Sequence, residues 1–268
     1  MTYQKVVITG AASGIGAALV KRFAAEGSTI LASDIQEAAL RDVATRHNCN
    51  HITADVRLPA DVSALADISW KLLGGVDLLC LNAGVAGPHK PSWEKSVAEW
   101  EWVLGPNLWG LIHGIRSFVP RMIAQSTPSA ILITASAAGF LSSPFGADYL
   151  ASKHAVVSIA ESLALEFKSL RIPIRVGILC PGFVRTNILH SMREQFSERL
   201  DPIRERQLEN YQALLASSPT PEEIVGIALQ QWHDGAFYLM THPELDDYIE
   251  RRHRAISDRV IPDLEPPL

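Results

Sequence analysis

Cysteine is scarce in this sequence, and its arrangement suggests neither a disulfide framework nor a zinc site. Cys49, Cys80 and Cys180 are the three cysteines among 268 residues, and they form no C-x-x-C pair. Widely separated cysteines in odd number are typical of reduced thiols, which predicts a cytoplasmic protein. The nine histidines show no H-E-x-x-H or similar ligand spacing, so no metal site is predicted.

Long apolar runs and strongly basic segments are also missing. Gly, Pro or charged residues interrupt every apolar stretch well before the roughly 20 residues that a bilayer-spanning helix needs. The first residues show no signal-peptide pattern. Lys and Arg number 24 against 29 Asp and Glu, a formal net charge of −5. We therefore expect no membrane span and no nucleic-acid partner.

What the sequence does have is a hydrophobic content of 47%, arranged as short apolar runs that alternate with segments of helical periodicity. Strands are expected at 6–8, 29–33, 51–54, 76–81, 130–135, 174–179 and 236–240. Helices are expected at 14–26, 36–46, 59–73, 95–125, 147–170, 185–217, 221–234 and 243–256. This alternation predicts an α/β fold, a doubly wound parallel sheet of about seven strands with helices on both faces.

No linker or low-complexity tract divides the chain. We therefore expect a single domain over 1–268, with a cofactor-binding part at 1–182 and a largely helical segment at 183–217 laid over the sheet. Thr220 and Pro221 are expected to begin the next helix as its N-cap and first residue.

A glycine-rich turn follows the first expected strand. It runs Thr9-Gly10-Ala11-Ala12-Ser13-Gly14-Ile15-Gly16, and its G-x-x-x-G-x-G spacing differs from the general dinucleotide fingerprint G-x-G-x-x-G. Glycines there allow close backbone approach, and the helix N-terminus that follows presents N–H groups to a pyrophosphate. A tight turn without a ligand is the alternative.

Asp34 ends the second expected strand, 24 residues after Gly10. An acidic residue at about this distance commonly holds the adenosine ribose hydroxyls of a dinucleotide. Its carboxylate would repel a 2′-phosphate, and neither Ser13 nor Ile35 offers a cation to receive one. These residues favour NAD over NADP, although Asp34 could instead merely cap the next helix.

Tyr149 and Lys153 stand four residues apart in an expected helix, so their side chains share one face. An ammonium beside a phenol lowers the phenol's pKa from its usual value of about 10, toward the range of a general base. Taken alone, the same pair could be an ordinary solvated helix face.

Together these residues resemble the short-chain dehydrogenase/reductase family over nearly the whole chain. Thr9 to Gly16 match its T-G-x-x-x-G-I-G turn, and Asn82-Ala83-Gly84 match its N-A-G motif. Pro181 to Thr186 are similar to its P-G-x-V-x-T segment. The family's catalytic tetrad falls on Asn107, Ser136, Tyr149 and Lys153.

The resemblance implies a Rossmann-like fold and a role for each tetrad residue. Tyr149 would be the acid/base, Lys153 would tune it and hold the nicotinamide ribose, and Ser136 would hold the substrate oxygen. Asn107 would keep a water in a proton relay, with Pro106 bending the helix before it. The implied cofactor-binding residues are Gly10, Ser13, Gly14, Ile15, Gly16, Asp34, Ile35, Asp55, Val56, Asn82, Ala83, Gly84, Tyr149, Lys153, Pro181, Gly182, Val184 and Thr186.

Within that set, Asp55 and Val56 would lie at the adenine, Asn82 and Gly84 near the adenosine ribose, and Val184 and Thr186 at the nicotinamide carboxamide. Members of the family form homodimers or homotetramers through helices equivalent to 95–125 and 147–170. The family's frequent glycine-rich ending after the last strand is missing here, where Met240-Thr241-His242-Pro243-Glu244 follows instead.

The predicted activity is an NAD-dependent oxidoreductase acting on a small to medium apolar secondary alcohol or ketone. The apolar substrate is inferred from segment 183–217, read as a lid whose apolar residues are Phe183, Ile188, Leu189, Met192, Phe196, Leu200 and Leu208. An NADPH-dependent carbonyl reductase is one alternative. A non-catalytic, NAD-responsive binding protein is another, from a different class.

Overall fold

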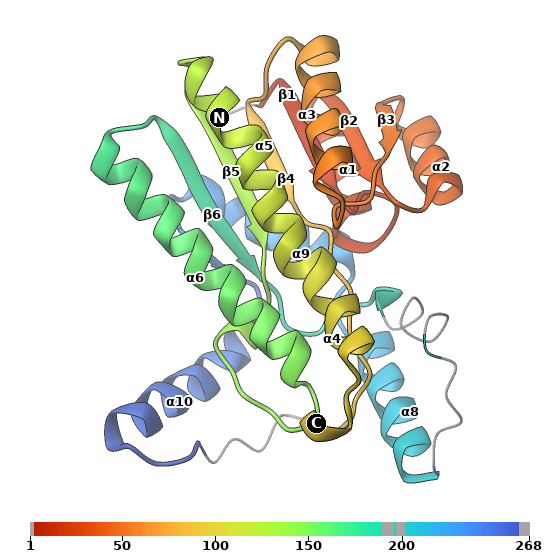
Figure 1. Ribbon diagram of the computed structural model, residues 1–268, viewed down its shortest axis with the longest axis vertical. Helices are drawn as coiled ribbons and strands as arrows, with labels where there is room; N and C mark the ends of the chain where they lie inside the picture. Colours follow the sequence, from red (N-terminus) through yellow and green to blue (C-terminus); the bar gives the residue numbers. More distant parts are fainter. Residues whose placement is uncertain (1–2, 189–195, 197–201, 263–268) are drawn as a thin grey trace.

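The computed structural model describes residues 3–188, 196 and 202–262. Within these residues seven strands form one parallel sheet in the order β3-β2-β1-β4-β5-β6-β7 (Figure 1). The strands are β1 (Lys5–Thr9), β2 (Thr29–Asp34), β3 (Asn50–Thr53), β4 (Leu78–Leu81), β5 (Ser129–Thr134), β6 (Ile174–Cys180) and β7 (Tyr238–Met240). The predicted doubly wound sheet is confirmed.

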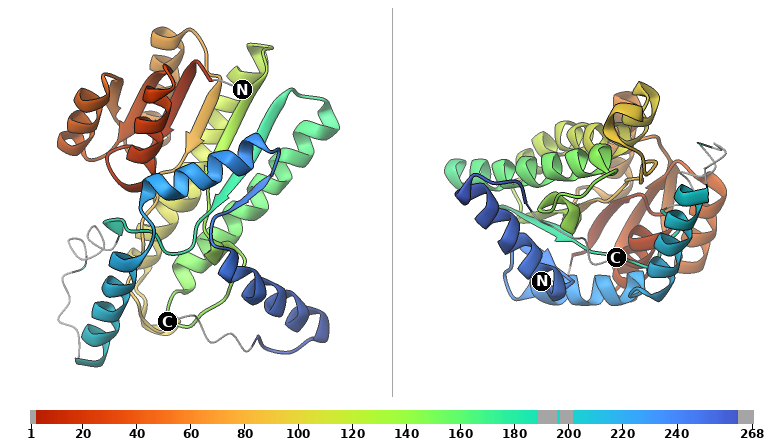
Figure 2. Two further views of the ribbon diagram at one scale, coloured as in Figure 1. Left: turned by 180° about the vertical axis from the view of Figure 1, so that it is seen from behind. Right: turned by 90° about the horizontal axis from the view of Figure 1, so that it is seen from below.

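Helices cover both faces of the sheet (Figure 2). One face packs against α1 (Gly14–Ala25), α2 (Glu37–His47) and α9 (Pro221–His233). The other packs against α3 (Pro59–Leu73), α5 (Gly110–Ala124) and α6 (Ala147–Leu170). The remaining described helices are α4 (Val97–Leu104), α8 (Pro202–Ser217) and α10 (Asp246–Asp258).

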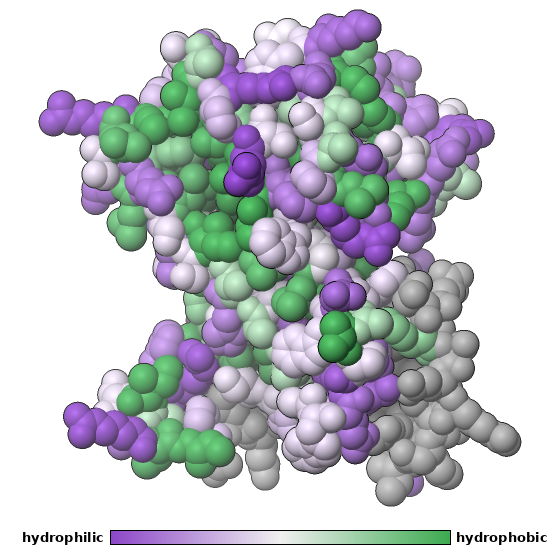
Figure 3. Space-filling model, viewed as in Figure 1, coloured by the Kyte–Doolittle hydropathy of each residue, from purple (hydrophilic) through white to green (hydrophobic). Residues whose placement is uncertain are grey.

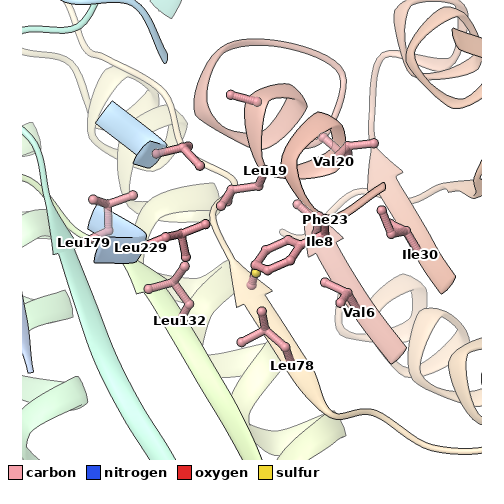
Figure 4. Packing of buried hydrophobic residues seen from close by; sticks show 14 of the residues in the cluster. Val6, Ile8, Leu19, Val20, Phe23, Ile30, Leu78, Leu132, Leu179 and Leu229 are labelled. Carbon is pink, nitrogen blue, oxygen red and sulfur yellow. The ribbon is translucent and has the colours of Figure 1, made fainter. Parts of the chain in front are cut away.

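Burial on both faces explains why the strands are almost continuously apolar. In β1, Val6 and Ile8 belong to the core beside α1 and α9, whereas Val7 belongs to the core on the opposite face, and all three side chains are fully buried. Figure 4 shows Val6 and Ile8 packed with Phe23 and with residues of neighbouring strands. Successive residues of a strand point to opposite faces, so a strand covered on both sides needs apolar residues at every position.

The expected helix at 95–125 is interrupted. α4 ends at Leu104, a π-helical turn η2 (Gly105–Trp109) follows, and α5 begins at Gly110. Pro106 has no N–H to donate to the helical ladder, and a π turn accommodates that loss. Where the sequence predicts a bend at Pro106, the structure has a π-helical interruption, and it places Asn107 inside the π turn.

The chain after β6 is helical from Pro202 to Ser217, and Thr220 begins α9 with a reciprocal capping box to Glu223, as predicted. The last strand starts at Tyr238 rather than Ala236, because Gly235 adopts a left-handed conformation with φ of +95° and turns the chain first. A short 3₁₀ turn (Pro243–Leu245) precedes α10, which projects from the body in Figures 1 and 2. None of the described helices is long and apolar enough to cross a bilayer.

Candidate active site

The sequence-predicted residues gather at the carboxyl edge of the sheet. Gly10 follows β1, Asp34 ends β2, Asn82 follows β4, Ser136 follows β5 and Pro181 follows β6. Because all the strands are parallel, their carboxyl ends share one edge, which is where open α/β sheets bind ligands.

The glycine turn is a cradle that side chains would fill. Gly10 and Gly14 have φ of +67° and +53°, and a Cβ added at Gly16 would lie 1.9 Å from the carbonyl oxygen of Gly10. The first turn of α1 holds no acidic residue, and the Ser13 side chain makes no capping hydrogen bond. The helix N-terminus thus keeps its partial positive charge and its N–H groups, and it fits a pyrophosphate.

Neighbouring motifs close around this turn. Ala83 lies behind Gly10, since a Cβ there would come 2.7 Å from the Ala83 Cα. On the other side, the methyl group of Thr186 would lie 3.2 Å from a Cβ at Gly14. The half-buried Ile15 and the buried Val184 belong to the same hydrophobic core, and their predicted contacts with a cofactor stay predictions.

Asp34 connects the turn to the start of α2. Its Oδ2 accepts a hydrogen bond from the Ala12 N–H (3.0 Å) and its Oδ1 accepts one from the Gln36 N–H (2.9 Å). Gln36, not Asp34, is the N-cap of α2. Each carboxylate oxygen retains a free lone pair for another donor, and the neighbouring Ile35 is exposed.

Asp55 and Val56 follow β3. Burial alone would raise the pKa of the Asp55 carboxyl, but its hydrogen bonds and 2.6 Å ion pair with Arg57 outweigh this effect and lower it. The carbonyl oxygen of Val56 lies 3.0 Å from Nδ1 of His113, which fixes this loop against α5.

Asn82 braces three strand ends. Its Nδ2 donates to the carbonyl oxygens of Thr9 and Gly10 (3.1 and 3.2 Å), and its Oδ1 accepts from the Thr134 hydroxyl (3.0 Å). The side chain therefore holds the glycine turn in place. Its predicted position near the adenosine ribose stays a prediction.

Asn107 is buried, and the chain itself engages its amide. Oδ1 accepts from the Val85 N–H (2.8 Å), while Nδ2 donates to the Val85 carbonyl (3.1 Å) and to the Ser152 hydroxyl (3.0 Å). A Cβ at Gly84 would lie 3.0 Å from Asn107 Oδ1 and 3.6 Å from Lys153 Nζ. The N-A-G motif thus lies directly against the tetrad.

The other tetrad residues meet between β5, β6 and α6. Ser136 Oγ accepts from the Ala138 N–H (3.1 Å), lies 3.2 Å from the Pro181 carbonyl and hydrogen-bonds the half-buried Tyr149 side chain. The buried Lys153 Nζ donates to the Thr134 carbonyl (3.2 Å) and lies 5.6 Å from the centre of the Tyr149 ring. The arrangement places a hydroxyl, a phenol and an ammonium side by side.

The expected downward shift of the Tyr149 pKa is wrong. Burial raises the pKa of Tyr149, and the hydrogen bond from Ser136 offsets only part of this rise. Burial also lowers the pKa of Lys153 to about 8, with Cys180 acting in the opposite direction. Desolvation disfavours the charged form of both groups, and it is the largest influence on each pKa.

An apolar cluster lies beside the tetrad's loops. Leu215 of α8 is buried against Ala86, Phe183, Ile188 and Phe196. Trp102 meets the Phe196 ring edge-to-face at 5.9 Å, and its indole N–H donates to the Ala86 carbonyl. Of the predicted lid residues, Leu189, Met192 and Leu200 lie outside the described residues, as does the side chain of Leu208.

Sequence reasoning missed several supporting residues. Ser152, which holds Asn107, lies three residues after Tyr149 in the same helix, so helical spacing could have drawn attention to it. Lys95 forms a buried ion pair of 2.9 Å with Asp148, directly before Tyr149. His242 contacts Gly182 and Phe183. No local pattern joins Lys95 or His242 to the site, because their partners are distant in the sequence.

Comparisons with known proteins identify relatives of this chain. The family model described as short chain dehydrogenase matches residues 4–197. A dehydrogenase/reductase of CLA biosynthesis from Lactiplantibacillus plantarum is 32% identical, covering 96% of this chain and 94% of the relative. A 1-deoxy-11-beta-hydroxypentalenate dehydrogenase from Streptomyces avermitilis is 39% identical, covering 67% of this chain and 68% of the relative.

A solved structure of a short chain dehydrogenase/reductase from Burkholderia phymatum, in complex with NAD, superposes with a TM-score of 0.94. It is 32% identical and the match covers 100% of this chain and 99% of that one. The chain belongs to the short-chain dehydrogenase/reductase family, a family of oxidoreductases.

Proposed function

We propose that this protein is an NAD-dependent dehydrogenase or ketone reductase acting on a small to medium apolar secondary alcohol or ketone, with Tyr149 as its acid/base. The observation that carries the proposal is the meeting of Ser136, Tyr149 and Lys153 next to the N-A-G motif, which itself contacts the glycine turn. A hydroxyl that can donate to an oxygen and a phenol that can exchange its proton are what alcohol–ketone conversion requires.

Bound nicotinamide supplies the hydride acceptor or donor. Ser136 donates a hydrogen bond to the substrate oxygen, and Tyr149 takes the proton of the alcohol or returns one to the alkoxide. Lys153 stabilises the phenolate by its charge. The Asn107 amide ties the π turn to Val85 and Ser152, and Asn107 would keep a water in a proton relay that runs from Tyr149 through the ribose hydroxyl and Lys153.

The residues that would hold the cofactor are those of the glycine turn with Asp34, the loops at Asp55–Val56 and Asn82–Gly84, and the segment Pro181–Thr186. The turn fits a pyrophosphate because a Cβ at Gly16 would close it. Asp34 supports NAD over NADP, because its carboxylate would repel a 2′-phosphate. The alternative, an NADPH-dependent reductase, would show a lower kcat/KM with NADH than with NADPH.

The cofactor assignment is tested by steady-state kinetics with both cofactors. We expect NADH to be preferred, and Asp34→Ser to raise the KM for NADH roughly tenfold, as the loss of charge-assisted hydrogen bonds implies. Glu37→Ser, which removes an exposed carboxylate paired with Arg41 on α2, is the control. A wild-type preference for NADPH would contradict the role given to Asp34.

The catalytic assignment is tested by two variants. Tyr149→Phe removes the phenolic proton and should abolish turnover while leaving NADH binding nearly unchanged, whereas Lys153→Ala should impair both. A panel of secondary alcohols, followed by NADH absorbance, would identify the substrate. NADH binding without turnover on any alcohol or ketone would favour the non-catalytic alternative, and undiminished turnover by Tyr149→Phe would refute the assigned acid/base.

An apolar substrate is supported by the cluster of Leu215, Phe183, Ile188 and Phe196 next to the tetrad's loops. A relative named for the dehydrogenation of a hydroxypentalenate supports an alcohol substrate. Segment 183–217 would close over the nicotinamide end and exclude water.

We further propose a cytoplasmic homodimer or homotetramer, built from one domain per chain. Large exposed apolar residues on and next to α4, α5 and α6 support an oligomer; they are Trp93, Val97, Trp109, Ile123, Leu165 and Leu170. Figure 3 shows apolar surface on the side of the molecule where α5 and α6 face the viewer. Analytical ultracentrifugation would test this, and a monomer at micromolar concentration would contradict it.

A further inference from the structure

His242 lies between the end of β7 and the segment that follows β6. Its side chain is buried, with 6% exposed. The Gly182 N–H and the Thr241 hydroxyl both lie 2.9 Å from Nδ1, and Nε2 lies 2.9 Å from the carbonyl oxygen of Phe183. The imidazole thus contacts the backbone of two consecutive residues of one loop.

These partners determine the protonation state of the ring. A backbone N–H can only donate, so Nδ1 must accept from Gly182. A carbonyl can only accept, so Nε2 must carry the proton and donate to Phe183. His242 is therefore neutral with its proton on Nε2, and it forms a two-point clamp on the loop.

The contact with His242 also leaves no room for a Cβ at position 182. A Cβ there would lie 2.8 Å from Cγ and 3.0 Å from Cδ2 of His242, and 3.0 Å from a methyl group of Leu245. Gly182 therefore rests directly on the imidazole. The glycine of the P-G pair, which matches the family's motif, is required here because the His242 ring contacts the backbone at this residue.

The loop held by His242 contacts both Ser136 and the glycine turn. Next to Gly182, the Pro181 carbonyl accepts from the Ala137 N–H (2.8 Å) and lies 3.2 Å from Ser136 Oγ. Four residues further on, Thr186 lies over the glycine turn at Gly14. A shift of the loop would therefore move the Ser136 hydroxyl together with the groups proposed to contact the nicotinamide.

We propose that His242 is a positioning residue: by fixing Gly182 and Phe183 it holds the nicotinamide side of the cofactor site and the Ser136 hydroxyl in place. The proposal rests on the proposed function, since it assigns the Pro181–Thr186 segment to the nicotinamide end. His242 would act through the loop, by its contacts with Gly182 and Phe183.

The test compares ligands that do and do not contain nicotinamide. His242→Phe keeps a flat ring against Gly182 but removes both hydrogen bonds to the loop, whereas His242→Asn keeps an acceptor near the position of Nδ1. Calorimetry is run with NADH and with ADP-ribose, which lacks the nicotinamide. Gln231→Leu is the control. It removes a 2.7 Å hydrogen bond to Met240, the last residue of β7, and Gln231 does not contact the loop.

We expect His242→Phe to weaken NADH binding at least tenfold, about what the loss of two hydrogen bonds implies, with ADP-ribose binding within twofold of wild type. His242→Asn should recover part of the NADH affinity, and Gln231→Leu should change neither ligand. NADH binding by His242→Phe equal to that of wild type would overturn the proposal. Equal weakening of both ligands would also overturn it, because that result indicates general damage to the fold.

A second measurement separates this proposal from the proposed function. In the ligand-free protein, His242→Phe should accelerate hydrogen exchange at the Gly182 amide more than tenfold, while Gln231→Leu leaves it unchanged. If wild-type protein binds neither NADH nor ADP-ribose, the proposed function fails. If the amide exchanges equally fast in wild type and His242→Phe, the clamp itself fails. Should His242→Phe not fold, His242→Asn carries the same comparisons.

Discussion

The proposed role of Lys153 requires a charged side chain, whereas its burial disfavours the charge. Its proposed role requires an ammonium beside Tyr149, yet the side chain is buried, with 4% exposed, and its pKa falls to about 8 from an ordinary value of 10.5. Only the Thr134 carbonyl is a hydrogen-bond partner at 3.2 Å among the described residues. A single neutral acceptor compensates little of the lost hydration of an ammonium, so burial of a charged Lys153 lowers the stability of the folded protein.

The pH dependence of unfolding should reveal that penalty. Between about pH 8 and 10.5 the unfolded chain keeps a Lys153 proton that the folded protein has lost, so the free energy of unfolding rises with pH. The rise amounts to about 3 kcal/mol across the window, and below pH 8 the penalty is fully present. Lys153→Met removes the ammonium and should abolish this component.

Urea unfolding of both proteins from pH 7 to 10 measures the effect as a difference. The buried Cys80 thiol, whose pKa burial raises, acts in the opposite direction but is common to both proteins. Lys71→Met, on the surface of α3, serves as the control and should give a constant difference from wild type. A difference between wild type and Lys153→Met that does not change with pH would contradict the proposed burial penalty.

At the scale of elements, the first turn of α6 is held in place by the loop after β4, which lies far from α6 in the sequence. The Lys95 ammonium pairs with Asp148 at 2.9 Å and also donates to the Pro88 carbonyl, and both side chains of the pair are essentially inaccessible to solvent. Asp148 Oδ1 accepts from the Tyr149 N–H (2.9 Å). The ion pair therefore holds the first turn of α6, and with it Tyr149, against the loop after β4.

Lys95→Met should destabilise the protein by about 3–5 kcal/mol, because it leaves the Asp148 carboxylate buried without its cation. The double variant Lys95→Met/Asp148→Leu should recover much of that loss, since it removes both charges. Arg254→Met breaks an exposed ion pair with Glu250 on α10 and should change stability by no more than about 0.5 kcal/mol. Chemical denaturation measures all three; a Lys95→Met protein as stable as the Arg254→Met control would contradict the argument.

These elements also show what a sequence can predict. The strands and the helices beside them follow from local apolar periodicity, and the tetrad follows from ordered motifs, so both could be anticipated. The Lys95–Asp148 pair and the His242 clamp join segments far apart in the chain, and nothing local marks the partners. The spacing of Tyr149 and Lys153 predicts the wrong direction for the Tyr149 pKa, because burial, which only the fold supplies, raises it and the Ser136 hydrogen bond offsets only part of the rise.

At the scale of the whole molecule, the first and last parts of the fold share one core. The Trp232 indole N–H on α9 donates to the Tyr3 hydroxyl at 2.9 Å, across 229 positions of sequence. The Arg175 guanidinium lies 3.9 Å from the ring centre, and a Cβ at Gly177 would overlap the ring. Trp232 therefore fills the space between α9, β6 and the segment before β1.

From this shared core we predict that the described residues unfold as one unit, without a separately folding cofactor-binding part. Trp232→Ala should lower the free energy of unfolding by about 3–5 kcal/mol, since it leaves a cavity and deprives Tyr3 of its donor. Leu72→Ala, at a half-exposed position on α3, should lower it by about 0.5 kcal/mol or less.

The number of midpoints in the urea unfolding curve tests this prediction. If the chain is one cooperative unit, urea unfolding of Trp232→Ala followed by circular dichroism and by fluorescence of the remaining tryptophans should give coincident curves with a single midpoint. Trp70 lies on the opposite face of the sheet, and Trp102 lies near the tetrad. Their fluorescence reports on regions that Trp232 does not contact. Two separated midpoints would mean that the part before β6 folds without α9, and the chain would then comprise two units instead of one.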